Sequence, residues 1–214
     1  MTKKERAQAF YEILKKAYPE ADCTLDYNTP FELLIATQLA AQCTDMRVNI
    51  VTKSLFRKYP DAESFANANL AELEEAIRPT GFFRNKAKNI IACSKKLISD
   101  FDGEVPDTMD SLLSLDGVGR KTANLVLGDI FGKGGMVIDT HAKRILFRVG
   151  LTNEIDPTKV ERDTEKLIKA ENQSEFCHRL VTHGRTFCTA RSPKCDLCPA
   201  AKLCKKNGLI KKTI

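Results

Sequence analysis

The chain has 214 residues, 43% of them hydrophobic and 29% charged, which is the composition of a globular protein and excludes an intrinsically disordered one. No apolar run is long enough to cross a membrane, and the charged N-terminus lacks the apolar core of a signal peptide, so we expect a cytoplasmic protein without membrane contact. The formal net charge of +6 suits a polyanionic partner without establishing one.

Apolar residues recur at helical spacing along the chain, and the sustained alternation typical of strands is absent, which predicts an all-α fold. Thr29 and Glu32 form a capping-box pattern, and Asp139 is placed to cap a later helix. Glycine-rich residues 131–135 indicate a hinge or domain boundary. The expected helices cover 10–18, 30–39, 45–59, 69–77, 85–101, 108–114, 122–131, 139–150, a segment from 157 onward, and 174–187.

The segment Leu115–Thr122 reads Leu-Asp-Gly-Val-Gly-Arg-Lys-Thr and joins two of these predicted helices. Its glycines allow a tight reversal that brings backbone N–H groups close to a phosphate, and the N-terminus of the next helix attracts anions. The pattern indicates a phosphate-binding helix–hairpin–helix. An ordinary helix connection followed by a solvated lysine is the alternative. The candidate phosphate-binding residues are Gly117, Val118, Gly119 and Arg120.

Eight cysteines in a cytoplasmic protein argue against disulfides and for metal ligands or buried thiols. Cys188, Cys195, Cys198 and Cys204 are separated by six, two and five residues, so four thiolates can enclose one metal centre. Spacing alone favours structural zinc over an iron–sulfur cluster. The other four fall in or near helical patterns and are predicted to be small buried residues; they are Cys23, Cys43, Cys93 and Cys177.

The hairpin, the segment 137–141 and the cysteine spacing together resemble the helix–hairpin–helix DNA glycosylases, in order from about Pro30 to Cys204. This resemblance implies a six-helix barrel domain (residues 23–134), a second helical domain (residues 1–22 and 135–214) and a DNA-binding cleft between them. It also implies that the four spaced cysteines hold a [4Fe–4S] cluster, which replaces the preference for zinc.

The same resemblance implies a bifunctional DNA glycosylase and AP lyase that removes oxidised pyrimidines from duplex DNA and cleaves the strand at the abasic site by β-elimination. Lys121 would form the Schiff base with the sugar, and Asp139, eighteen residues later, would assist by stabilising the cationic sugar and handling the lysine proton. A helix N-cap is the alternative role for Asp139. His141 is interpreted either as a catalytic or as a structural histidine.

The damaged nucleotide must leave the duplex, and the resemblance assigns Gln42 to the vacated space and Phe82 to a wedge between bases. The alternatives are a helix-surface amide for Gln42 and a core residue near a turn for Phe82. Arg191 and Lys194 would contact phosphates, or else be solvated loop charges. The family commonly has Pro where this chain has Asp116, which puts hairpin stiffness and DNA affinity in question.

Three other functions compete with the bifunctional one. The first is a monofunctional mismatch glycosylase of the same fold, which typically lacks a lysine at the position of Lys121. The second is a non-catalytic DNA-binding scaffold in which Lys121 only holds phosphate. The third is a zinc-stabilised interaction module. We expect a monomer whose partner is duplex DNA containing damaged bases or abasic sites, associated with the nucleoid.

Overall fold

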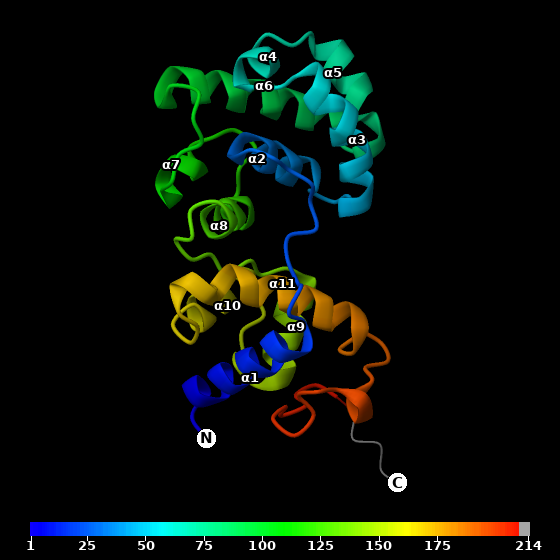
Figure 1. Cartoon of the computed structure of the whole chain (residues 1–214), viewed down its shortest axis with the longest axis vertical. Helices are drawn as coiled ribbons and strands as arrows, with labels where there is room; N and C mark the ends of the chain where they lie inside the picture. Colours follow the sequence, from blue (N-terminus) through cyan, green and yellow to red (C-terminus); the bar gives the residue numbers. More distant parts are fainter. Residues whose placement is uncertain (210–214) are drawn as a thin grey trace. The chain divides into compact units, whose positions relative to one another are not determined.

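The structure is a computed structural model that describes residues 1–209. Every regular element in this part of the chain is a helix, so the predicted all-α fold is confirmed (Figure 1). The chain forms two compact units. One is Cys23–Phe131, called here the 23–131 unit; the other combines Met1–Asp22 with the described residues from Gly132 onward and is called the two-segment unit.

The 23–131 unit is built around α2 (Pro30–Leu39), which is buried on all sides from Phe31 to Leu39. A helix without a polar face is stable only when other helices surround it. Those that share the core, directly or through α6 or α8, are α3 (Asp45–Lys58), α4 (Ala62–Ala66), α5 (Leu70–Ile77), the 3₁₀ turn η1 (Arg78–Thr80), α6 (Phe83–Phe101), α7 (Met109–Leu113) and α8 (Arg120–Asp129).

The two-segment unit contains α1 (Lys3–Ala17), α9 (Thr140–Val149), α10 (Pro157–Thr164), α11 (Ala170–Thr186) and the 3₁₀ turn η2 (Cys195–Leu197). Helix α11 packs against both α1 and α9. Phe10 of α1 meets Phe176 of α11 edge to face, with ring centroids 6.0 Å apart. The cysteine-bearing segment follows α11 directly, so the packing of that helix fixes where the segment begins.

Most helix starts follow the predicted capping residues, and the departures have local causes. Thr29 caps α2, but the Glu32 carboxylate accepts the N–H of Asn28 at 2.6 Å, so the reciprocal bond of a capping box is not formed. Helix α1 begins at Lys3, seven residues before the predicted start at residue 10, and α6, α8 and α11 begin two to four residues earlier than predicted, since polar first turns carry no apolar periodicity. Helix α4 is not predicted from the sequence, because its five residues are too few to show a helical period.

Candidate active site and cysteine pocket

The hairpin between α7 and α8 is anchored by its apolar residues and closed by backbone bonds. Leu115 and Val118 are buried, and the Val118 N–H donates to Leu115 O at 3.2 Å. Gly117 has φ +73°, and a Cβ there would lie 2.8 Å from Gln38 Oε1. The first glycine of the Gly-Val-Gly turn therefore lies close to Gln38 of α2 and Asn89 of α6, and the turn needs glycine there for both conformation and space.

Gly119 occupies the N-cap of α8 without any side-chain hydrogen bond. The first amides of a helix have no intrahelical acceptor, so the start of α8 presents N–H donors and the positive end of the helix dipole. Lys121 is exposed in this first turn, next to Arg120. The predicted helix–hairpin–helix geometry is confirmed, and its donors and cations are of the kind that binds phosphate.

Gln42 and Phe82 share an uncommon backbone conformation. Their φ angles are 55° and 50°, and both side chains are exposed, Phe82 by 63%. Gln42 lies in a turn after α2, and Phe82 is the N-cap of α6. The alternatives of a helix-surface amide and a core phenylalanine are therefore wrong. A left-handed conformation in a bulky residue costs energy and is a frequent mark of functional positions.

Asp139 is the N-cap of α9, and its Oδ1 accepts the Ala142 N–H at 2.7 Å. The capping role predicted for this residue is confirmed by that bond. His141 lies in the first turn of the helix, with Nδ1 3.1 Å from Arg144 Nη2. Burial lowers the pKa of His141 below its usual value, against the opposing effect of the Asp139 carboxylate. These contacts give His141 a structural setting.

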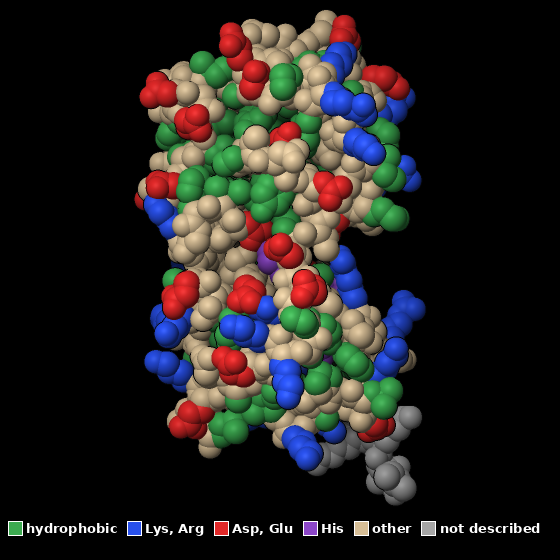
Figure 2. Space-filling model, viewed as in Figure 1, with side chains coloured by type: hydrophobic (Ala, Val, Ile, Leu, Met, Phe, Trp, Pro, Cys, Tyr) green, Lys and Arg blue, Asp and Glu red, His purple; other side chains and the backbone are tan. Residues whose placement is uncertain are grey.

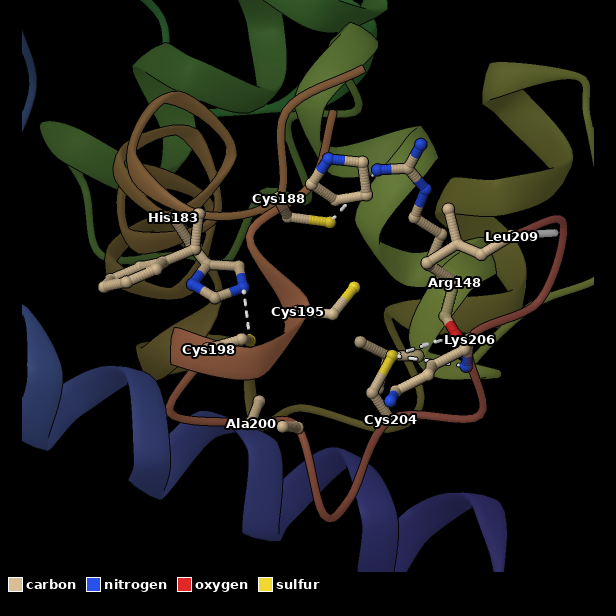
Figure 3. Close-up of a pocket in the computed structure, with 13 residues that line it drawn as sticks. Arg148, His183, Cys188, Cys195, Cys198, Ala200, Cys204, Lys206 and Leu209 are labelled. Atoms are coloured by element: carbon tan, nitrogen blue, oxygen red, sulfur yellow. Dashed lines mark hydrogen bonds between the residues drawn. The ribbon is translucent and has the colours of Figure 1, made fainter. Parts of the chain in front are cut away.

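The four spaced cysteines line one pocket at the end of α11, together with Arg148 of α9 and His183 of α11 (Figure 3). Their side chains converge although the sequence spreads them over seventeen residues. Burial raises the pKa of the Cys198 and Cys204 thiols, and the neighbouring sulfurs act in the same direction. Thiolates at these positions therefore require a positive partner, and a metal centre supplies one.

Several donors and acceptors surround the sulfurs in Figure 3. Arg148 Nη1 lies 3.4 Å from Cys188 Sγ, and the Lys206 N–H donates to Cys204 Sγ at 3.3 Å. His183 Nε2 lies 3.7 Å from Cys198 Sγ, while its Nδ1 is 2.9 Å from the Tyr18 hydroxyl. Burial lowers the pKa of His183 to about 4, so its ring is neutral near pH 7. Such hydrogen bonds to sulfur are typical of metal–thiolate sites.

Arg144, Arg148 and His183 were missed by the sequence reasoning. The two arginines lie four residues apart on α9, so both face the same segment. Arg144 Nε donates to Cys188 O at 2.9 Å, and Arg148 donates to Thr189 O at 2.7 Å. The only available signal was their i, i+4 spacing before a cysteine-rich segment, and this spacing is equally common on solvated helix faces.

Arg191 and Lys194 are exposed in the segment between Cys188 and Cys195. The Lys194 N–H donates to Phe187 O at 2.8 Å, which closes this segment into a loop. On the face shown in Figure 2, basic and acidic side chains are interspersed, so the net charge of +6 is not gathered into one patch there.

The remaining cysteines divide into two pairs. Cys93 and Cys177 are buried, as predicted, and burial raises the pKa of Cys93 to about 12. Cys23 and Cys43 are only half-buried, so the prediction of buried thiols is wrong for them. Cys23 lies in the loop between α1 and α2 and Cys43 in the loop between α2 and α3, where a helical pattern does not determine exposure.

Comparison with known proteins agrees with this geometry. Residues 35–170 match the HhH-GPD superfamily of base excision DNA repair proteins. The chain is 52% identical over 204 residues to endonuclease III of Synechocystis sp. (95% of this chain and 93% of the relative), and 44% identical over 202 residues to that of Bacillus subtilis (91% and 92%).

Two solved structures, a non-covalent endonuclease III–DNA complex and a trapped endonuclease III–DNA covalent intermediate, each match with a TM-score of 0.89 and 42% identity. In each case the match covers 96% of this chain and 97% of the other. The chain therefore belongs to the endonuclease III branch of the HhH-GPD superfamily. Among the described residues, none of the helices has the length and apolar character that a membrane span requires.

Proposed function

We propose that this protein is a bifunctional DNA glycosylase and AP lyase of base excision repair that acts on oxidised pyrimidines in duplex DNA at the nucleoid. One observation carries the proposal. Lys121 is an exposed amine in the first turn of α8, directly after a hairpin whose geometry suits phosphate. The likeness to an endonuclease III trapped covalently on DNA supports the assignment of a covalent step to this chain.

In this mechanism the Lys121 amine attacks the sugar C1′ of the damaged nucleotide. A bond forms between Nζ and C1′ while the bond from C1′ to the base breaks, and the base leaves with a proton. Ring opening gives a protonated Schiff base, which acidifies the C2′ proton. Removal of that proton breaks the C3′–O bond and expels the 3′ phosphate. An amine suits both steps because it first serves as the nucleophile and then withdraws electrons as an iminium.

Asp139 assists this reaction through its carboxylate. One oxygen is held by the Ala142 N–H at 2.7 Å, which fixes the orientation of the carboxyl group. A carboxylate fixed in this way can stabilise a cationic sugar and accept the proton that the attacking amine loses. The capping bond and the catalytic role are therefore compatible, since each uses a different part of the same group.

Gln42 and Phe82 open the duplex for this chemistry. A base inside a duplex is out of reach, so the nucleotide must rotate out of the stack. Phe82 presents an exposed aromatic ring that can wedge between bases, and Gln42 presents an exposed amide that can occupy the vacated space. Their left-handed backbone conformations support the assignment, because they project both side chains from turns.

The four converging cysteines would hold a [4Fe–4S] cluster. The fit rests on the convergence of four sulfurs in one pocket, on the donors from Arg148 and Lys206, and on the raised thiol pKa values, which call for a positive partner. When bound, such a cluster supplies rigid cross-links through metal–thiolate bonds. Arg191 and Lys194 then lie on a loop fixed at both ends and can contact DNA phosphates.

Borohydride trapping tests the catalytic proposal. The purified protein is incubated with labelled duplexes that contain either an abasic site or thymine glycol, with borohydride to reduce a Schiff base to a stable adduct. We expect adducts on both duplexes for the wild type and none for Lys121→Ala. Lys88→Ala, which removes an exposed lysine of α6, serves as the matched control and should leave trapping intact.

The outcomes separate the competing functions. An adduct on the abasic duplex alone would indicate that the protein is a lyase without glycosylase activity. Base release without any adduct would indicate a monofunctional glycosylase, and salt-dependent binding without either product would indicate a scaffold. Iron and sulfide analysis tests the cluster separately, and a colourless protein with stoichiometric zinc would overturn the [4Fe–4S] assignment.

A further inference from the structure

Lys86 is a buried cation inside the barrel core. Its residue is 7% exposed, although a lysine is rarely buried without a partner. The ammonium group donates to Leu39 O at 2.8 Å and to Thr80 O at 2.8 Å. Burial lowers the pKa of Lys86, because holding the charge away from water is costly. The two carbonyls that offset this cost belong to segments 47 and 6 residues away in sequence.

The first carbonyl belongs to the last residue of α2. Carbonyls in the final turn of a helix have no intrahelical donor, and the negative end of the helix dipole favours a cation there. The chain leaves α2 at this point and enters the turn that carries Gln42. That turn is closed by the Cys43 N–H, which donates to Ala40 O at 3.1 Å. The ammonium of Lys86 thus holds the start of the Gln42 turn.

The second carbonyl belongs to the end of η1, two residues before Phe82. The backbone N–H of Lys86 also donates to Phe82 O at 3.1 Å. The ammonium group of Lys86 therefore holds the chain just before the Gly81–Phe82 link, and just after the link the chain is held by the first intrahelical bond of α6, from the Lys86 N–H to Phe82 O. Phe82 has no side-chain capping bond of its own, and its ring is 63% exposed. Its conformation must therefore be fixed by the flanking backbone.

We propose that Lys86 is a positioning residue that joins the Gln42 turn to the Phe82 turn, so that both side chains enter the DNA together as a rigid unit. This inference rests on the proposed function, in which Gln42 and Phe82 open the duplex. Lys86 touches neither the substrate nor the reacting atoms. Its effect is to keep two left-handed turns, which are costly conformations, from relaxing when no DNA is bound.

The proposal predicts that removing the Lys86 ammonium group slows base excision only where the damaged base is paired. Lys86→Met keeps the length and the apolar stem of the side chain but removes the ammonium. Under single-turnover conditions we expect excision of thymine glycol from a fully paired duplex to slow by about tenfold or more, since small misplacements of positioning groups carry large kinetic penalties. Excision from a short unpaired bubble, where no base needs to be extruded, should stay within about twofold of the wild type.

Matched variants distinguish a positioning role of Lys86 from a nonspecific effect of the substitution on the protein. Lys88→Met removes an exposed lysine from the same helix and should leave both rates unchanged. In a Gln42→Ala/Phe82→Ala background, adding Lys86→Met should change the paired-duplex rate by less than about twofold, because the residues act as one unit. Lys86→Arg, which keeps a cation with several N–H donors, should recover part of the rate on the paired duplex.

Three results would overturn the proposal: unchanged excision from the paired duplex, equal slowing on paired and unpaired substrates, or additive effects in the Gln42→Ala/Phe82→Ala background. Circular dichroism and borohydride trapping on a single-stranded abasic oligonucleotide establish that the variant is folded and that Lys121 is active. If Lys86→Met unfolds, Lys86→Gln replaces it, since an amide can still bond one carbonyl. Failure of the wild type to form an adduct would instead contradict the proposed function, so the two failures are distinguishable.

Discussion

Arg148 and Cys188 lie 3.4 Å apart, measured from Nη1 to Sγ, and the same guanidinium group donates to Thr189 O at 2.7 Å and to Ala190 O at 2.9 Å. A guanidinium group presents several donors in one plane, so a single side chain can fix three consecutive residues. Arg148 is 8% exposed and belongs to the core of the two-segment unit. The start of the cysteine loop is thus tied to α9 independently of any metal.

Replacement of Arg148 by Met should loosen this loop. The change removes a charged donor from two carbonyls and one sulfur, and we expect the free energy of unfolding to fall by about 2 kcal/mol. Chelator-induced loss of the visible absorbance of the holoprotein should also be faster. Lys143→Met, on the same helix, is the control. Equal behaviour of the two variants would show that the Arg148 bonds do not hold the loop.

The hairpin offers a matched pair of glycines. Gly117→Ala places a Cβ at φ +73° and within 3 Å of Gln38 and Asn89, so the strained backbone and the overpacking together should lower the free energy of unfolding by about 3 kcal/mol. Gly119→Ala meets nothing within 4 Å at φ −101° and should cost less than about 1 kcal/mol. Urea unfolding of both variants measures the difference, and similar losses would contradict this account of the turn.

The sequence was most informative where a local rule determines structure. The glycine pair in 115–122 predicts the hairpin because a tight reversal needs residues that accept positive φ, and Gly117 has such an angle. Thr29 and Asp139 predict helix starts because their side chains cap the first turn within a few residues. The cysteine spacing predicts convergence because short loops between ligands can close around one centre.

Other features depend on distant contacts and have no local signature. The left-handed angle of Phe82 is not a property of phenylalanine, and it occurs where the Lys86 side chain holds the preceding Thr80 carbonyl and α6 begins directly afterwards. The sequence pattern around Lys86 is that of an amphipathic helix and predicts an ordinary solvated lysine at this position. Arg148 and His183 are similar, because a polar residue in a helix gives no sign that its partners lie across the fold.

The Glu175–Arg179 ion pair predicts a pH-dependent contribution to stability. The Arg179 side chain is 3% exposed, and the Tyr11 hydroxyl donates to the other Glu175 oxygen at 2.8 Å. The hydrogen bond from Arg179, and then that from Tyr11, lower the pKa of Glu175 against the opposing effect of burial. Since the unfolded carboxyl group binds a proton more readily, the contribution is complete above the ordinary carboxyl pKa and is lost as the pH falls through the lowered value.

Glu175→Gln should therefore lower the free energy of unfolding by about 1 to 2 kcal/mol near pH 7, a value reduced for the partial exposure of Glu175. The difference from the wild type should shrink as the pH falls below the ordinary carboxyl range. Glu171→Gln removes an exposed carboxylate from the same helix, 3.8 Å from Lys169, and should have almost no effect. A difference that is constant with pH would contradict the linkage.

The cysteine loop predicts a specific change in the salt dependence of DNA binding. Arg191 and Lys194 are exposed, so their removal leaves no buried group unpaired and should leave the melting temperature unchanged. If each cation neutralises one phosphate, Arg191→Ala and Lys194→Ala should each reduce the slope of log K against log salt by about one, and the double variant by about two.

The measurement is fluorescence anisotropy of an uncleavable abasic duplex across a salt series. Lys202→Ala, a charge-matched change at an exposed lysine between Cys198 and Cys204, serves as the control for loss of net charge. A slope that falls equally for Lys202→Ala would mean that the loop acts only through its total charge. An unchanged slope for Arg191→Ala and Lys194→Ala would instead make them solvated charges, because counterion release follows only from direct neutralisation of phosphates.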